Sequence, residues 1–151
     1  MCIRDRFGGD FKQEVAASAQ RCFEVAAAVE DYPGWHAAIG AVRVLERNAA
    51  GRPALVEAEI DAGLTTVKLR LRFAYGPSDV SCERESGDLR SMQASFAFAE
   101  LGEGRAEVSY STAMDPGRML SMMISGPVAG RLRVKLVDDV VAGFKRAVEA
   151  A

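Results

Sequence analysis

The stretch Val29-Glu30-Asp31-Tyr32-Pro33-Gly34-Trp35 closes an alanine-rich helical pattern and precedes a strand-like run. Pro33 has no amide hydrogen and disfavours helical geometry at Tyr32, while Gly34 adds backbone freedom. We therefore expect the main helix to stop near Asp31, and any helix after Pro33 to be short and to run in another direction. The chain's only tryptophan, Trp35, follows this break. A large aromatic at such a bend either fills the core or lines a cavity, and both alternatives stay open.

The residues before this stretch predict one strand and one helix. Phe11 to Val15 forms a short strand pattern, and the helical pattern covers residues 19–30. Ser18 is suited to cap that helix, because its hydroxyl accepts a hydrogen bond from a first-turn amide. Residues 1–6 fit neither a secretion signal nor the first strand and resemble translated adapter sequence. We therefore expect one domain over residues 7–151, preceded by a non-native or disordered N-terminus.

Strand-like runs separated by turn residues follow the break. We predict strands over residues 42–47, 55–61, 64–75, 80–85, 92–100 and 106–114. The clearest alternation places one set of apolar side chains on one face and basic side chains on the other: Val67, Leu69, Leu71, Phe73 and Tyr75 against Lys68, Arg70 and Arg72. A sheet with one packed face and one wet face is typical of antiparallel strands, and the short turns favour a meander.

The last third of the chain predicts a long helix that covers the packed face of the sheet. Over residues 119–148, apolar side chains recur every four residues: Leu120, Ile124, Val128, Leu132, Leu136, Val140 and Phe144. Gly126-Pro127 interrupts the pattern, so we expect a kink or a short separate first segment there. A helix of this length across a curved sheet leaves a gap that side chains need not fill.

Composition limits the classes of function. At 151 residues the chain can bury a sizeable core. Its net charge of −2 provides no basic face for nucleic acid. No apolar stretch approaches the ~20 residues of a membrane span, and a cytoplasmic protein is expected. The three cysteines, Cys2, Cys22 and Cys82, have no metal-binding spacing and are expected to be inert thiols in a reducing compartment.

Four segments together resemble the START-like superfamily (SRPBCC), which includes polyketide cyclases/dehydrases, lipid-transport proteins and coenzyme Q-binding-like proteins. They are Phe23-Glu24-Val25, the stretch from Val29 to Trp35, Val42-Arg43-Val44-Leu45-Glu46 and Leu136-Val137-Asp138-Asp139. The resemblance covers roughly residues 10–150. It implies an α+β helix-grip fold, in which a curved antiparallel sheet of about six or seven strands wraps around a long C-terminal helix. Two short helices follow the first strand in that fold.

The resemblance also implies an apolar cavity between the sheet and the last helix. The side chains expected to bind a ligand there are Trp35, Val67, Leu69, Leu71, Phe73, Phe96, Phe98, Tyr110, Met123, Ile124 and Val128. The sequence contains no nucleophile–histidine–acid set, phosphate loop or nucleotide-binding fingerprint, so no catalytic residue, metal ligand or cofactor is predicted.

For three sets of polar or flexible side chains, a role at the cavity has to be weighed against an ordinary structural position. His36 could bind a carbonyl or shuttle a proton at the mouth of the cavity, but a surface position is preferred for it. Tyr110 is a candidate inward hydroxyl, whereas alternation points Arg70 and Arg72 away from the apolar face, unlike the strand arginine of the cyclases. The methionines Met114, Met119, Met122 and Met123 form either a deformable gate or ordinary packing, and packing is slightly preferred.

The leading hypothesis is a carrier or binder of a hydrophobic small molecule: a lipid, an isoprenoid or quinone, or an aromatic polyketide. One alternative is a polyketide cyclase or aromatase. The other is an interaction protein that affects respiration or ribosomes. We expect no nucleic-acid partner, no stable membrane insertion, and a monomer or a weak homodimer.

Overall fold

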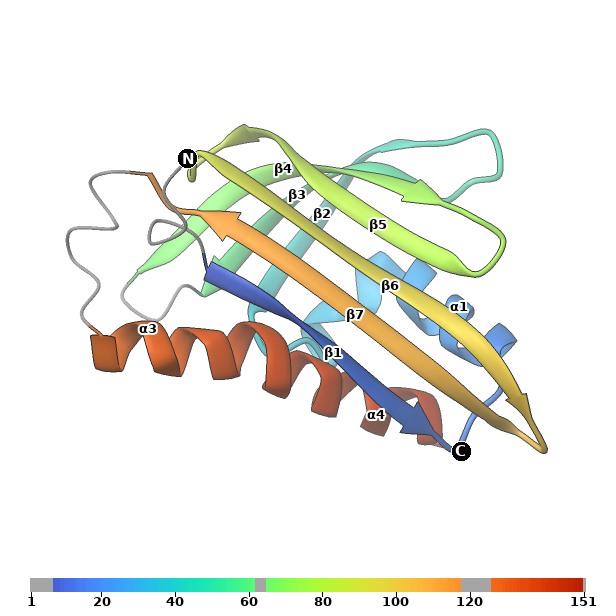
Figure 1. Ribbon diagram of the computed structural model, residues 1–151. Coiled ribbons are helices and arrows are strands. Elements are labelled where there is room, and N and C mark those ends of the chain that lie inside the picture. Colours follow the sequence, from blue (N-terminus) through green and yellow to red (C-terminus); the bar gives the residue numbers. More distant parts are fainter. Residues whose placement is uncertain (1–6, 62–64, 118–125, 151) are drawn as a thin grey trace.

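One curved antiparallel sheet forms the frame of the protein. The structure, a computed structural model, describes residues 7–61, 65–117 and 126–150. Seven strands lie in the order β1-β7-β6-β5-β4-β3-β2 (Figure 1). Their bounds are β1 Phe7–Val15, β2 Ile39–Arg47, β3 Pro53–Asp61, β4 Thr66–Tyr75, β5 Asp79–Gly87, β6 Ser91–Gly102 and β7 Arg105–Asp115. The first and the last strand in sequence are therefore neighbours, and the five hairpins from β2 to β7 form the predicted meander.

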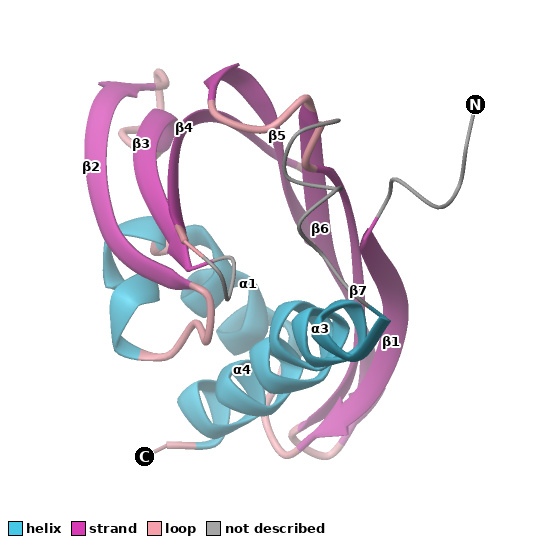
Figure 2. Ribbon diagram, turned by 90° about the vertical axis from the view of Figure 1, so that its left-hand side faces the viewer, coloured by secondary structure: helices cyan, strands magenta, loops and turns pink. Residues whose placement is uncertain are grey.

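The helices lie on the concave side of the sheet. They are α1 Ala19–Ala27, the 3₁₀ helix η2 Val29–Gly34, α3 Gly126–Arg133, the π-helical turn η3 Val134–Asp138 and α4 Asp139–Glu149. Figure 2 shows the sheet curving around the run from α3 to α4, with α1 on the same side. This arrangement confirms the α+β helix-grip fold, including the two short helices after the first strand.

The break after the first helix differs in detail from the prediction. Ser18 caps α1 as expected, with its hydroxyl accepting from the amide of Arg21 at 3.1 Å. The helix ends at Ala27 rather than near Asp31, and a 3₁₀ helix that contains Pro33 follows at once. Three residues per 3₁₀ turn place Val29 and Tyr32 on one side, and both are buried. The tighter winding thus buries two side chains before the chain turns into the sheet.

The C-terminal helix is described from Gly126 onward, and Pro127 is its second described residue. The predicted residues 119–125 of this helix lie outside the described part. An unexpected π-helical turn, Val134–Asp138, joins α3 to α4. No helix within the described ranges is long and apolar enough to cross a membrane.

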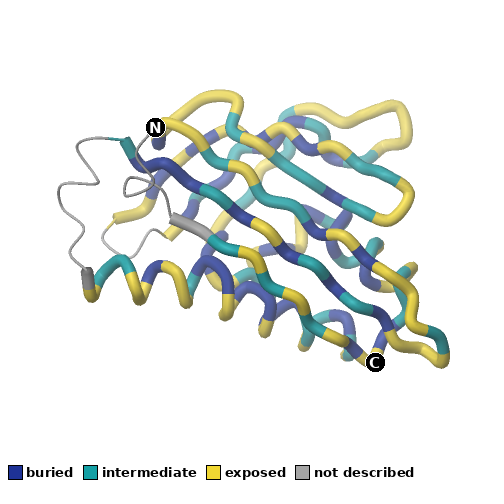
Figure 3. The backbone as a smooth tube through the Cα atoms, viewed as in Figure 1, coloured by how far each residue is buried: buried dark blue, intermediate teal, exposed yellow. Residues whose placement is uncertain are grey.

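Burial follows the predicted alternation along the strands (Figure 3). In β4, Val67, Leu69 and Leu71 are buried, whereas Arg70 and Arg72 are exposed. The inward-facing side chains and the buried face of α4 share one hydrophobic core. The basic side chains therefore lie on the outer face of the sheet, as alternation predicts.

Candidate functional site

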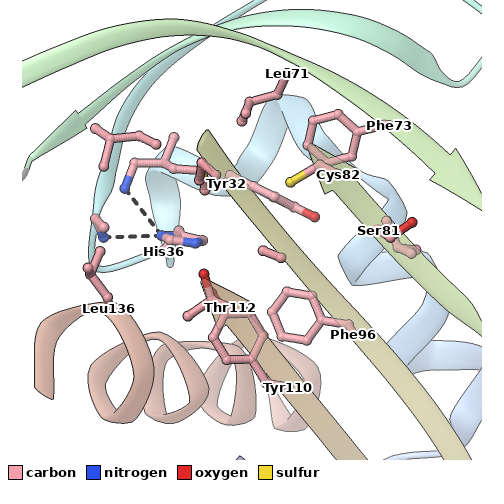
Figure 4. Close-up of a pocket in the computed structure, with 16 residues that line it drawn as sticks. Tyr32, His36, Leu71, Phe73, Ser81, Cys82, Phe96, Tyr110, Thr112 and Leu136 are labelled. Carbon is pink, nitrogen blue, oxygen red and sulfur yellow. Dashed lines mark hydrogen bonds between the residues drawn. The ribbon is translucent and has the colours of Figure 1, made fainter. Parts of the chain in front are cut away.

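A small cavity lies between the concave face of the sheet and the C-terminal helix. Its volume is about 40 Å³, above the roughly 10–15 Å³ that one water molecule requires. Its wall comes from η2 and the segment after it, from β2 to β7 and from η3 (Figure 4). The lining residues are Tyr32, His36, Ala38, Ile39, Ile60, Leu71, Phe73, Val80, Ser81, Cys82, Met92, Ala94, Phe96, Tyr110, Thr112 and Leu136.

His36 is the most distinctive polar group of this wall. Its Nδ1 accepts hydrogen bonds from the backbone amides of Ala38, at 3.1 Å, and Ile39, at 3.2 Å. The ring stacks on Tyr32 with a centroid distance of 5.8 Å. Burial lowers the pKa of His36 to about 4, and the residue as a whole is half-buried. The imidazole is therefore neutral near pH 7, and its proton resides on Nε2.

This position contradicts the preferred interpretation of His36 as a surface residue. The sequence contained no signal for it, because the two amides that hold Nδ1 come from Ala38, just before β2, and from Ile39, the first residue of β2. The other nitrogen of the ring lies on the side away from these amides and faces the interior of the cavity (Figure 4).

The hydroxyl groups of the wall are neutral, and two of them already donate to the protein. The Tyr32 hydroxyl donates to the carbonyl of Ala26 at 2.5 Å, and Thr112 Oγ1 donates to the carbonyl of Gln93 at 3.1 Å. Burial raises the pKa of the Tyr110 hydroxyl and raises the pKa of the Cys82 thiol to about 12. None of these groups carries a charge at neutral pH.

The structure brings together four of the eleven residues expected to bind a ligand. Leu71, Phe73, Phe96 and Tyr110 line the cavity. Val67, Leu69 and Phe98 are buried in the same core but do not line the cavity, and Val128 packs against the core while partly exposed. Met123 and Ile124 lie outside the described residues.

Of the two positions left open for Trp35, the structure favours filling the core over lining the cavity. Its ring packs against Phe144 of α4, with a centroid distance of 5.4 Å, and against Phe96 at 6.2 Å. Phe144 also stacks on Phe96 at 4.7 Å. The Nε1 hydrogen of Trp35 is buried and has no acceptor among the residues that the structure describes. Much of the space beneath the helix is therefore filled by the protein's own aromatic rings, and the cavity remains beside them.

Several lining residues were not predicted from the sequence, although strand alternation or the helical apolar stripe indicates some of them. Met92 and Ala94 share the inward parity of Phe96 along β6, and Thr112 shares that of Tyr110 along β7. Leu136 belongs to the four-residue apolar stripe of the last helix. By contrast, no sequence pattern indicated that Tyr32 and Ile39 contribute to the wall.

The remaining candidates that the structure describes do not line this cavity. Of the four methionines in the suggested gate, Met114 is buried in the core, and Met119, Met122 and Met123 lie outside the described residues. Within residues 7–61, 65–117 and 126–150, no three His, Cys, Asp or Glu side chains come close enough to hold a metal ion.

Comparison with known proteins identifies relatives of this fold. The family described as "Polyketide cyclase / dehydrase and lipid transport" matches residues 15–141. No curated protein matches the sequence.

Three solved structures are similar across nearly the whole chain. A START superfamily protein from Mycobacterium smegmatis is 19% identical with a TM-score of 0.81, covering 94% of this chain and 97% of its own. The Zhui aromatase/cyclase from Streptomyces sp. R1128 is 17% identical with a TM-score of 0.74, covering 96% and 97%. A major latex-like protein from Panax ginseng is 11% identical with a TM-score of 0.68, covering 97% and 99%. At these identities the likeness shows the fold alone.

Proposed function

Since the chain belongs to the polyketide cyclase/dehydrase and lipid transport family, we propose that it binds a hydrophobic small molecule in the cavity beneath its C-terminal helix. The proposed ligand is a lipid, an isoprenoid or quinone, or an aromatic polyketide. The names of the similar structures, a START superfamily protein and an aromatase/cyclase, fit this range of ligands.

The observation that carries the proposal is the chemistry of the cavity wall. Most lining side chains are aliphatic or aromatic, and none of those described carries a formal charge at neutral pH. Burying apolar ligand surface in such a wall contributes about 25 cal/mol per Å². A few convergent polar groups in an apolar pocket are typical of sites that fix the orientation of a ligand.

The size of the cavity limits which ligands can bind without a change in the wall. At about 40 Å³ it is too small for a lipid chain or a fused ring system, so a ligand of that size has to displace lining side chains. Met92 is unbranched and flexible, and Leu136 lies on the π-helical turn rather than on a regular helix. We expect these two side chains to move when a ligand enters.

A pair of variants on one strand tests the proposal. Ala94 on β6 faces the cavity, whereas Ala97 on the same strand is exposed on the outer face. We expect the neutral dye Nile red to bind the unmodified protein saturably, with increased fluorescence. Ala94→Leu should weaken the binding at least tenfold, while Ala97→Leu should leave it unchanged. Melting curves confirm that both variants fold, and native mass spectrometry detects any ligand that co-purifies from cells.

Two results would count against ligand binding in this cavity. One is equal dye binding by the unmodified protein and Ala94→Leu, which would place the dye elsewhere. The other is the absence of both saturable dye binding and a co-purified ligand.

A polyketide cyclase or aromatase is the second candidate function. Its support is that two of the groups that ring closure could use, His36 and Tyr110, line the cavity. A neutral imidazole with its proton on Nε2 is suited to polarise a substrate carbonyl by donating a hydrogen bond. Turnover of a model polyketone, lost in His36→Asn, would establish this function. The absence of ring-closed product from a polyketone that binds would exclude it.

A further inference from the structure

The two backbone amides that face Nδ1 of His36 determine what its other nitrogen can do. An imidazole nitrogen that accepts hydrogen bonds carries no proton, so the neutral ring must hold its proton on Nε2. Protonating Nδ1 would direct its N–H group at the amide hydrogens of Ala38 and Ile39. The nitrogens of these two amides lie 3.1 and 3.2 Å from Nδ1. The fold therefore keeps His36 as a neutral hydrogen-bond donor toward the cavity (Figure 4).

The rest of the described wall offers no positive charge. Among the described lining residues there is no Lys or Arg, and the basic side chains of β4, Arg70 and Arg72, point to the outer face of the sheet. The hydrogens of the Tyr32 and Thr112 hydroxyls are already donated to backbone carbonyls. An anionic ligand group inside the cavity would thus be buried without a counter-charge, which is strongly unfavourable.

We propose that His36 is a specificity-determining residue, whose Nε2 hydrogen binds an uncharged oxygen of the ligand, a ketone or quinone carbonyl, and that the cavity rejects the corresponding carboxylates. The inference rests on the proposed function and narrows its ligand class, because it excludes free fatty acids and other organic acids. A carbonyl oxygen accepts the Nε2 hydrogen without placing a net charge in the cavity. The apolar body of the ligand then contacts the aliphatic and aromatic wall.

Three small ligands that share one aromatic ring test this specificity: acetophenone with a ketone, benzoate with a carboxylate, and ethylbenzene with no oxygen. Each is titrated into the full chain at pH 7, and binding is followed by two-dimensional NMR. We expect acetophenone to bind about 5- to 10-fold more tightly than ethylbenzene, since one hydrogen bond contributes about 1 kcal/mol. Benzoate should bind more weakly than either.

Two variants of His36 distinguish its role as a hydrogen-bond donor to the ligand from its role in the fold. In His36→Asn, the side-chain oxygen can still accept from the amides of Ala38 and Ile39, but no hydrogen reaches the cavity from the Nε2 position. This variant should bind acetophenone and ethylbenzene with equal affinity, because the ketone-specific donor is gone. In His36→Gln, the longer side chain can return an N–H donor toward the cavity, and part of the ketone preference should return.

The outcomes distinguish this inference from the function on which it rests. If ethylbenzene and acetophenone bind equally to the unmodified protein, or if benzoate binds as tightly as the ketone, the specificity is overturned while ligand binding stands. If His36→Asn retains the full ketone preference, another group binds the oxygen and the role of His36 is overturned. If none of the three ligands binds saturably while Nile red does, the inference is overturned and the proposed function stands; if Nile red also fails to bind and no ligand co-purifies, both fail.

Discussion

Gly143 of α4 lies directly against the backbone of Trp35. A Cβ atom at position 143 would stand 2.2 Å from the Trp35 carbonyl oxygen, well inside van der Waals contact. The C-terminal helix can therefore approach the segment after η2 this closely only because residue 143 has no side chain. This approach brings Phe144 of the same helix against the Trp35 ring.

Gly143→Ala should destabilise the protein. The atom in the way belongs to the backbone, so relief requires the helix or the bend to shift, which costs roughly 1–3 kcal/mol. Urea denaturation followed by circular dichroism measures the change in the free energy of unfolding. Gly130→Ala is the matched control, because Gly130 is an exposed glycine of α3 with open space around its Cβ position. That control should stabilise the protein by up to about 1 kcal/mol, since alanine favours helix. Equal effects of the two substitutions would contradict the close approach.

Trp35 should tolerate replacement by phenylalanine far better than by alanine. Trp35→Ala removes a ring packed against Phe96 and Phe144, and such truncations cost about 3–5 kcal/mol. Trp35→Phe keeps a ring in place and also removes a buried N–H group that has no acceptor among the described residues. Because an unpaired buried donor itself costs about 1–3 kcal/mol, we expect a net loss below about 2 kcal/mol for phenylalanine. Chemical denaturation of both variants checks this order, and a reversed order would contradict it.

The fold was largely predictable because its strands and helices bury one face each. Alternation in β4 and the apolar stripe of the last helix both follow from this requirement. The alternation is present in the structure, and so is the described C-terminal part of the stripe from Leu132 to Phe144. The π-helical turn at Val134–Asp138 was not predicted, although the stripe contained a hint of it. Apolar residues spaced by four advance faster than the 3.6 residues of an α-helical turn. A wider turn restores their alignment, so Leu132, Leu136 and Val140 are all buried.

The candidate site was less predictable because tertiary packing decides which inward-facing side chains border empty space. Val67 and Leu71 share one face of β4, yet only Leu71 lines the cavity. His36 faces the cavity because the amides of Ala38 and Ile39 hold its ring, and that contact depends on how the chain enters β2. Periodicity therefore predicts which residues are inside but not where the packing leaves a gap.

The two described cysteines should resist thiol reagents in the folded protein. Burial raises the pKa of Cys22 to about 11 and that of Cys82 to about 12, so little reactive thiolate exists at pH 8. We expect iodoacetamide to leave both residues unmodified over a period in which it fully modifies them in urea. Peptide mass spectrometry assigns the modified sites. Rapid modification of Cys82 in the folded state would contradict the raised pKa of its thiol.

Protonation of His36 should couple the stability of the protein to pH. Its pKa is about 4 in the folded protein, against an ordinary value of 6.5 in the unfolded chain. Between these two values the unfolded chain binds more protons than the folded protein. The free energy of unfolding therefore rises with pH from about 4 to 6.5 and levels off above that range, with a slope of at most about 1.4 kcal/mol per pH unit.

The contribution of His36 is isolated by comparing the protein with His36→Asn, which retains an acceptor for the amides of Ala38 and Ile39 but does not titrate. We expect the unmodified protein to lose about 2 kcal/mol more stability than the variant when the pH falls from 7 to 5. Urea denaturation at both pH values gives this difference, and the shared carboxylates cancel in it. NMR of the ring carbon-bound hydrogens should show no titration above pH 5. A ring that titrates near pH 6.5, or the same pH dependence in both proteins, would mean that His36 is not enclosed as described.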